Sequence, residues 1–202
     1  MSELRLTDLE KSFEERRLFS GLSYAFPSVG LFLIEGDSGT GKTTLLRMIA
    51  GLDNNYRGSI TGGGAEAVSF AFQEHRLFPT LSALANVAEI LYAEGLSKQE
   101  ALTAAGEALL AVGLPTEAHK LRPAALSGGM RQRVSLARAF ASSRPILLLD
   151  EPEKELDEGL REQLAELICR EALRRLVLVV THTPARLAPF ADGILTIGAQ
   201  NP

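Results

Sequence analysis

The sequence has a single cysteine, no tryptophan and no long apolar segment. Because Cys169 has no second cysteine to pair with, a disulfide within the chain is excluded. The longest uninterrupted apolar runs, residues 108–112 and 176–180, have five residues each, far fewer than the roughly 20 that span a bilayer. The first residues also lack a basic segment followed by an apolar stretch, so no leader is expected. These absences predict a cytoplasmic protein that does not cross a membrane alone.

An excess of positive charge is also lacking, since 21 Lys and Arg face 25 Asp and Glu, for a formal charge of −4. This balance argues against a protein that coats nucleic acid, so no nucleic-acid partner is expected. A chain of 202 residues can bury about 70% of its surface without disulfides or metals. We therefore expect one compact unit with a genuine core.

Short apolar segments followed by helical patterns recur along the chain, at residues 31–34, 68–72, 146–149 and 176–180. This alternation is typical of a parallel sheet buried under helices. Residues 3–9 and the stretch around 22–26 instead alternate apolar and polar, which predicts an antiparallel sheet at the N-terminal end. The sequence therefore indicates an α/β fold.

Helical spacing replaces these strand patterns at residues 80–114, where two helices fit. The second is expected to begin at Ser97, with Glu100 completing a capping box. Further helices are predicted at 127–141 and at about 158–175, and the Thr183–Pro184 pair reads as another helix start.

A phosphate-binding motif spans Gly36 to Thr43, directly after an apolar strand and before a helical run. Its glycines let successive N–H groups converge on phosphate oxygens, and the helix N-terminus adds positive potential. Lys42 can reach the outer phosphates, and Thr43 offers a hydroxyl to Mg²⁺. The alternative is an ordinary glycine-rich turn.

Two acids, Asp150 and Glu151, end the apolar strand 146–149. Asp150 can hold the Mg²⁺ shell, and Glu151 can polarise a water for in-line attack on a γ-phosphate. Taken alone, acids at a strand end are more typical of helix caps or solvated loops. Beside a phosphate loop, the catalytic interpretation is favoured.

The segment Leu126-Ser127-Gly128-Gly129 resembles the signature motif of the ATP-binding subunits of ABC transporters, and the resemblance extends from about Leu4 to Gly198. A capped helix start explains the segment by itself, because Ser127 can cap the backbone there. In that family, the motif binds the γ-phosphate of ATP held by the opposite subunit. The resemblance implies a P-loop NTPase fold whose RecA-like core is a mostly parallel sheet, with an N-terminal antiparallel β subdomain and an inserted α-helical subdomain.

The same resemblance assigns four residues outside the three motifs. Gln73 is similar to the glutamine that touches Mg²⁺ or the attacking water, and His182 to the histidine that contacts the γ-phosphate. Phe13 resembles the aromatic that stacks on adenine, and Asp157 the end of the D-loop. The alternatives are a structural histidine at a strand end and a core phenylalanine.

The resemblance assigns the site residues to three roles: catalysis, metal binding and ATP binding. Catalysis falls to Glu151, His182, Gln73 and Lys42, and metal binding to Thr43, Gln73 and Asp150. ATP would be bound by Phe13, Gly36, Asp37, Ser38, Gly39, Thr40, Gly41, Lys42, Thr43, Thr44, Ser127, Gly128, Gly129 and Met130.

Residues 72–79, with Leu81 and Asn86, are most similar to import-type subunits of the nitrate, sulfonate or taurine kind. The implied partners are a second ATP-binding subunit, membrane permease subunits docking near residues 73–79, and a solute-binding protein. Leu77 and Phe78 are candidate docking residues, although a core role fits them equally. The implied location is the inner face of the cell membrane.

The chain departs from the family at Glu153, Lys154 and Glu155, where small or apolar residues are usual. Like charges there could repel across a dimer unless Lys154 pairs with an acid, so homodimer and heterodimer stay open. A solvated charged turn is the alternative. Thr183 also stands where the family commonly has aspartate.

The expected function is that of an ATPase subunit that binds ATP and Mg²⁺ and powers solute transport. We expect one ABC ATPase domain over residues 1–202, with 1–79 and 145–202 forming the β subdomain and core and about 80–144 the helical subdomain. Two alternatives are a regulatory or scaffolding ATPase of a membrane complex that moves no solute, and a soluble P-loop phosphotransferase.

Overall fold

The structure, a computed structural model, describes residues 3–13 and 16–198 and divides into two compact units. Unit 1 comprises Met1–Phe70, Arg144–Asp150 and Ile168–Pro202. Unit 2 comprises Ala71–Ser143 and Glu151–Leu167. Within the described ranges, no helix is long and apolar enough to cross a membrane.

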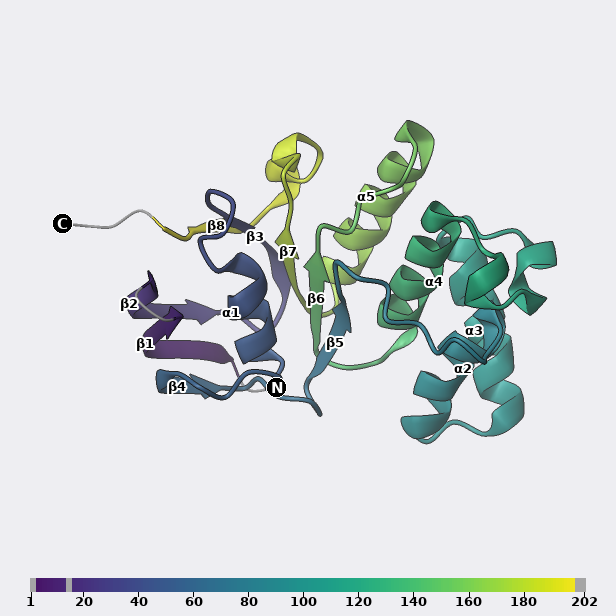
Figure 1. Cartoon of the computed structure of the whole chain (residues 1–202), viewed down its shortest axis with the longest axis horizontal. Helices are drawn as coiled ribbons and strands as arrows, with labels where there is room; N and C mark the ends of the chain where they lie inside the picture. Colours follow the sequence, from purple (N-terminus) through teal and green to yellow (C-terminus); the bar gives the residue numbers. More distant parts are fainter. Residues whose placement is uncertain (1–2, 14–15, 199–202) are drawn as a thin grey trace. The chain divides into compact units, whose positions relative to one another are not determined.

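A five-stranded sheet of order β5-β6-β7-β3-β8 runs through unit 1 (Figure 1). Its central strands β3 (Gly30–Glu35), β6 (Ile146–Asp150) and β7 (Leu176–Val180) pair in parallel. All five residues of β6 and of β7 are buried, because both faces of a parallel sheet are covered. The edge strands are β5 (Val68–Ala71) and β8 (Gly193–Thr196). The four predicted apolar strands are thus present.

An antiparallel sheet of order β2-β1-β4 forms the second layer of unit 1. Its strands β1 (Leu4–Phe13) and β2 (Arg16–Phe26) are longer than the predicted ones, and β4 (Arg57–Thr61) was not predicted. A Cβ on Gly58 would overlap the Thr7 and Asp8 carbonyl oxygens. The strand therefore needs glycine for a close approach at the bulge of β1, where Asp8 has φ +48°.

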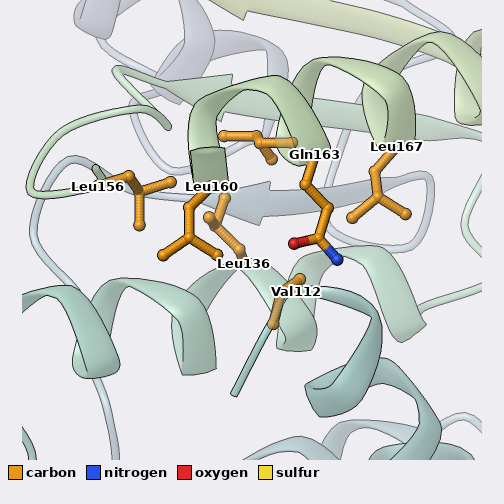
Figure 2. Close-up of a pocket in the computed structure, with 7 residues that line it drawn as sticks. Val112, Leu136, Leu156, Leu160, Gln163 and Leu167 are labelled. Carbon is orange, nitrogen blue, oxygen red and sulfur yellow. The ribbon is translucent and has the colours of Figure 1, made fainter. Parts of the chain in front are cut away.

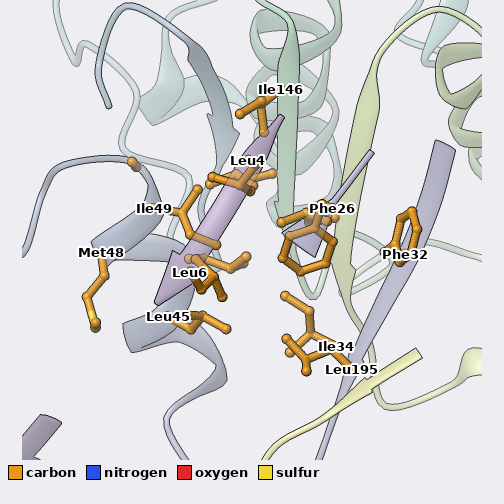
Figure 3. Packing of buried hydrophobic residues seen from close by; sticks show 14 of the residues in the cluster. Leu4, Leu6, Phe26, Phe32, Ile34, Leu45, Met48, Ile49, Ile146 and Leu195 are labelled. Carbon is orange, nitrogen blue, oxygen red and sulfur yellow. The ribbon is translucent and has the colours of Figure 1, made fainter. Parts of the chain in front are cut away.

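The core of unit 1 lies between the two sheets and includes helix α1 (Lys42–Ile49) (Figure 3). Phe26 is fully buried and meets the Phe32 ring edge-on, with 5.4 Å between ring centroids. Leu45 and Ile49 of α1 are also fully buried in this cluster. Because α1 begins at the phosphate loop, packing of its apolar face fixes the loop's helical end.

Unit 2 is built of helices α2 (Ala83–Ala93), α3 (Lys98–Ala111) and α4 (Gly128–Ala141) and the 3-10 helices η1 (Thr116–Lys120) and η2 (Pro123–Ala125). The predicted capping box is confirmed: Ser97 and Glu100 exchange side-chain and backbone hydrogen bonds. The predicted start of α4 is also confirmed, since the Ser127 hydroxyl accepts a hydrogen bond from the Met130 N–H.

Helix α5 (Glu158–Ala172) ends three residues before the predicted Arg175. The Arg174 and Arg175 N–H groups both donate to the Glu171 carbonyl, and this turn leads directly into β7. The predicted helix start at Thr183–Pro184 is a single 3-10 turn, η3 (Pro184–Arg186), followed by η4 (Ala188–Phe190). Thr183 makes no side-chain cap there, and Pro189 lacks the N–H that a continuing helix would need.

An apolar pocket lies in unit 2 between α4, the first turns of α5 and the end of α3 (Figure 2). Leucines dominate its lining, together with Val112 and Gln163. The Gln163 amide donates to the Ala111 carbonyl. Leu156 enters this pocket and is 5% exposed, so the charged segment just before it is anchored by an apolar side chain.

Candidate active site

The phosphate loop connects β3 to α1 within unit 1. Gly41 has φ +102° and caps α1, and the Leu45 N–H donates to its carbonyl at 2.8 Å. A Cβ on Gly36, at φ +146°, would overlap the Ile197 carbonyl oxygen. Only glycine fits both positions without strain. The loop therefore has the backbone that a cradle for phosphate oxygens requires.

Lys42 is the buried cation of this loop, with 7% of its surface exposed. Its Nζ donates to the Gly36 carbonyl at 2.7 Å and to the Asp37 carbonyl at 2.9 Å. Thr40 closes the turn, since its hydroxyl and its N–H both donate to the Asp37 carbonyl. The ammonium is thereby held at the centre of the loop, where it can meet phosphate oxygens.

Thr43 and Asp150 link the two sequence motifs of unit 1. The Thr43 Oγ1 donates to Asp150 Oδ2 at 2.8 Å, across 107 residues of sequence. Asp150 is 1% exposed and ends β6. A hydroxyl and a carboxylate held side by side are oxygen ligands of the kind that Mg²⁺ prefers.

His182 follows β7, the neighbour of both β3 and β6. Because the three strands are parallel, the phosphate loop, Asp150 and His182 all lie at the carboxyl edge of one sheet. Ligands bind at this edge in open α/β sheets. His182 is exposed, unlike a histidine that only fills the core.

Phe13, the predicted adenine platform, is 51% exposed at the end of β1 and is therefore not a core residue. Lys11 Nζ lies 4.8 Å from its ring centroid and forms an ion pair with Asp53 at 2.8 Å. Burial alone would raise the pKa of Asp53, but hydrogen bonds from Lys11 and from the Asn55 N–H bring it below its ordinary value. A buried cation thus supports the ring, which has surface left for stacking.

Arg16 is a residue of this region that the sequence alone did not single out. It pairs with Phe13 across the β1–β2 hairpin. Its Nη1 lies 3.2 Å from the position that a Cβ on Gly39 would take. A guanidinium beside the phosphate loop is suited to bind phosphate oxygens. No motif marks an arginine in a hairpin, so only the fold reveals this neighbour.

In unit 2, Gln73 and Glu151 are in direct contact. The Gln73 Nε2 donates to Glu151 Oε2 at 2.9 Å. Glu151 has φ +50°, an uncommon conformation for a non-glycine residue. The amide and the unusual backbone together fix where the carboxylate points. The sequence predicted both residues separately but not their contact.

Residues 72–82, the segment between β5 and α2, are held by two side chains whose contacts sequence reasoning did not predict. Arg138 donates to the Arg76 carbonyl at 2.9 Å and to the His75 carbonyl at 3.3 Å. Asn86, which has no exposed surface, accepts from the Phe78 N–H and donates to the Phe78, Leu81 and Ser82 carbonyls. Phe78 itself is 45% exposed, so a core role is wrong for it.

The signature segment starts α4 in unit 2. Ser127 is its N-cap, and Gly128 and Gly129 form the first turn. The Arg131 guanidinium donates to the Leu126 carbonyl at 2.8 Å. Of the predicted site residues, Lys42, Thr43, Asp150 and His182 thus belong to unit 1, and Gln73, Glu151 and the signature residues to unit 2.

The fold and these motifs together define a P-loop domain of the ABC type. The sequence model of the ABC transporter family matches residues 19–154, more than half of the chain. The chain belongs to the ABC transporter family.

Named relatives are import proteins. The Fe(3+) ions import ATP-binding protein FbpC of Rhizobium etli is 40% identical, covering 94% of this chain and 57% of the relative. The thiamine import protein ThiQ of Rhizobium meliloti is 39% identical, covering 95% and 84%. The aliphatic sulfonates import protein SsuB of Pseudomonas entomophila is 40% identical, covering 96% and 72%. The predicted likeness to import-type subunits is confirmed, although the chain spans only 57% of the iron-import relative.

Among solved structures, a dimeric ATP-binding cassette in a post-hydrolysis state with ADP and Pi matches with a TM-score of 0.87. That cassette is 28% identical, and the match covers 96% of this chain and 94% of the cassette. The predicted fold class, a P-loop NTPase with a mostly parallel sheet and an antiparallel sheet, is confirmed.

Proposed function

We propose that the chain is an ATP-binding and ATP-hydrolysing subunit that powers solute import through membrane-embedded partner subunits. The observation that carries the proposal is the hydrogen bond between Thr43 and Asp150. It joins the loop suited to phosphates to the acid suited to Mg²⁺, and an ATPase needs both in one place. The import direction rests on the names of the relatives.

On this proposal, ATP stacks its adenine on Phe13, and the backbone from Gly36 to Thr44 binds its phosphates with Lys42. Oxygens of Thr43, Asp150 and Gln73 would hold Mg²⁺. The donor set fits the ion, because all three side chains offer hard oxygen ligands. When bound, Mg²⁺ neutralises charge that develops on the β- and γ-phosphate oxygens.

Glu151 is the proposed general base, which orients a water and accepts its proton as it attacks the γ-phosphate. Gln73, at 2.9 Å from Glu151, holds the carboxylate in position. His182 donates to the γ-phosphate, and Lys42 stabilises its charge. Each role is one that phosphoryl transfer requires, since positioning and electrostatics supply most of its catalysis.

Ser127, Gly128, Gly129 and Met130 are proposed to bind the γ-phosphate of ATP held by a second ATP-binding subunit. A capped helix N-terminus with two glycines suits a phosphate group. The dimeric state of the matched cassette supports this pairing. Residues 80–144 would work as the helical subdomain, with 1–79 and 145–202 as the β subdomain and core.

The proposed membrane partners are permease subunits that dock near residues 73–79, where Phe78 presents exposed apolar surface. A solute-binding protein would deliver the solute to them. The chain would then act at the inner face of the cell membrane, as a peripheral subunit. Docking on a segment held by Arg138 and Asn86 gives the partner a fixed surface to bind.

Glu151→Gln tests the catalytic assignment. The variant should bind MgATP like the parent chain and lose at least about 100-fold in turnover, because general-base catalysis is removed. Glu153→Gln, which removes the same charge two residues away, is the matched control and should keep its turnover. Unchanged turnover in Glu151→Gln would refute the role given to Glu151.

A further inference from the structure

Glu155 lies against the signature segment of the same unit. A Cβ on Gly128 would overlap Glu155 Oε2, and a Cβ on Gly129 would lie 2.7 Å from the Glu155 carbonyl oxygen. The nearest atoms that these two added carbons would meet outside their own helix all belong to Glu155. The charged loop that departs from the family pattern therefore covers the first turn of α4.

The conformation of this loop is fixed from several sides. The Lys154 N–H donates to the Glu151 carbonyl and the Leu156 N–H to the Glu153 carbonyl, both at 3.2 Å. Glu155 has φ +63°, and the buried Leu156 side chain lines the apolar pocket of Figure 2. The Gln132 amide of α4 also donates to the Pro152 carbonyl at 2.9 Å. These contacts hold the Glu155 carboxylate at the start of the helix.

The electrostatics of the contact are those of an anion at a helix N-terminus. The free N–H groups of the first turn carry partial positive charge, which attracts a carboxylate as it attracts a phosphate. Ser127 caps only the Met130 N–H. His75 Nε2 lies 3.9 Å from Glu155 Oε2, and Arg131 and Lys154 add positive potential nearby. The Glu155 carboxylate thus has the surroundings that a phosphate group would need.

We propose that Glu155 competes with the partner-held γ-phosphate for the signature segment, and so sets the ATP concentration at which two subunits pair. The carboxylate must move aside before the phosphate reaches Gly128 and Gly129, because both are anions and share one small surface. This inference rests on the proposed function. It assigns to Glu155 an effect on pairing, with no effect on the binding of ATP by the phosphate loop.

The test measures nucleotide-dependent dimerisation by light scattering in a Glu151→Gln background, which keeps ATP intact. Three further variants are compared in that background: Glu155→Gln, which removes the charge at equal size; Glu155→Ala, which removes the side chain; and Glu153→Gln, which removes a charge from the same loop. The binding of MgATP to each chain is titrated separately at low protein concentration.

Glu155→Gln and Glu155→Ala should each lower the MgATP concentration for half-maximal dimerisation, by about tenfold for one unit charge at this distance. Glu153→Gln should change it far less. If the parent does not dimerise, dimers of the two Glu155 variants support the proposal.

Three outcomes would overturn the proposal. The MgATP concentration for half-maximal dimerisation could be equal in the parent and both Glu155 variants, none of them could form a dimer, or Glu153→Gln could shift this concentration as much as the Glu155 variants do. The titration of MgATP separates this failure from that of the proposed function. A chain that binds no MgATP fails as an ATPase subunit, whereas intact binding with an unmoved dimer midpoint refutes only the role of Glu155.

Discussion

The Thr43 hydroxyl donates a hydrogen bond of 2.8 Å to the Asp150 carboxylate, which is 1% exposed. A buried carboxylate is costly unless hydrogen bonds or a cation compensate for its desolvation. The contact therefore ties the folding of the phosphate loop to the strand that carries the acid. It also sets two oxygen atoms of the kind that Mg²⁺ prefers next to each other.

Thr43→Val is expected to weaken Mg²⁺-dependent ATP binding by about 10- to 100-fold, because a ligand and the partner of Asp150 are lost together. Binding of ATP in EDTA should change much less. Thr43→Ser keeps the hydroxyl and serves as the control. Isothermal titration with and without Mg²⁺ makes the comparison, and equal losses in both conditions would contradict a metal role.

Gln73→Ala should lower kcat by about tenfold or more and weaken Mg²⁺-dependent binding of ATP, because it frees the Glu151 carboxylate and removes a proposed Mg²⁺ ligand. The Kd for ATP in EDTA should stay within about twofold, since the phosphate loop is untouched. Steady-state turnover and equilibrium binding, measured on the same preparation, separate the two effects. Glu74→Ala, a change at the exposed neighbouring residue, is the control. An equal loss of ATP binding in EDTA would show that the glutamine holds the nucleotide itself.

Arg16→Gln is expected to raise the Kd for ATP several-fold, because one charge-assisted hydrogen bond to a phosphate oxygen is lost. Adenosine has no phosphates, so its weaker binding should not change. Arg17→Gln is the matched control, because neighbouring side chains of a strand point to opposite faces. Fluorescence titration at low and high salt measures both ligands, and an equal effect on adenosine would place Arg16 away from the phosphates.

Asn86→Ala should destabilise the fold strongly, by about 3 kcal/mol or more, because four hydrogen bonds between this fully buried amide and the backbone of Phe78, Leu81 and Ser82 are lost. Asn86→Asp keeps the acceptor for the Phe78 N–H and loses only the donors. Urea denaturation ranks the three proteins. A loss below about 0.5 kcal/mol in Asn86→Ala, as for a surface change, would mean that other contacts hold this segment.

The sequence predicted those parts of the site whose chemistry is local. The phosphate loop follows from glycine spacing and a strand-to-helix context, and β6 and β7 follow from apolar runs that only a doubly covered sheet buries. Arg16 acts on residues that the fold brings near, so no local pattern marks it. Asn86 belongs to a segment that the sequence identified, but its hydrogen bonds to the backbone of Phe78, Leu81 and Ser82 depend on how that segment turns into α2. Strand β4 was missed because most of its residues are polar and exposed. Its glycine, Gly58, is needed only because carbonyl oxygens of β1 lie so close, and that contact cannot be read from residues 57–61 alone.

For Glu155, the sequence identified the residue but did not predict its contact. The sequence showed that residues 153–155 depart from the family pattern. It left two interpretations open, repulsion across a dimer and a solvated charged turn. Its contact with Gly128 depends on two loop residues with positive φ, Glu151 and Glu155, a conformation that non-glycine residues rarely adopt. Neither residue type predicts that backbone, so the contact emerges only from the folded loop.

His75 should make stability depend on pH. Burial lowers its pKa, and Arg131 and Lys154 act in the same direction, whereas Glu155 opposes them; the folded pKa lies below the ordinary one. The unfolded chain takes up the proton at about pH 6.5, so below this pH protonation favours the unfolded state. Stability is therefore fully present above about pH 6.5 and is lost as the pH falls through the folded pKa.

His75→Gln tests this dependence, because it removes the proton-binding group and leaves the other two histidines in place. Urea midpoints measured from about pH 7.5 down to about pH 5.5 should fall more steeply in the parent chain than in the variant. Glu155→Gln should steepen the loss further, since the carboxylate is the group that favours protonated His75. Parallel curves for parent and His75→Gln would assign the pH dependence to other groups.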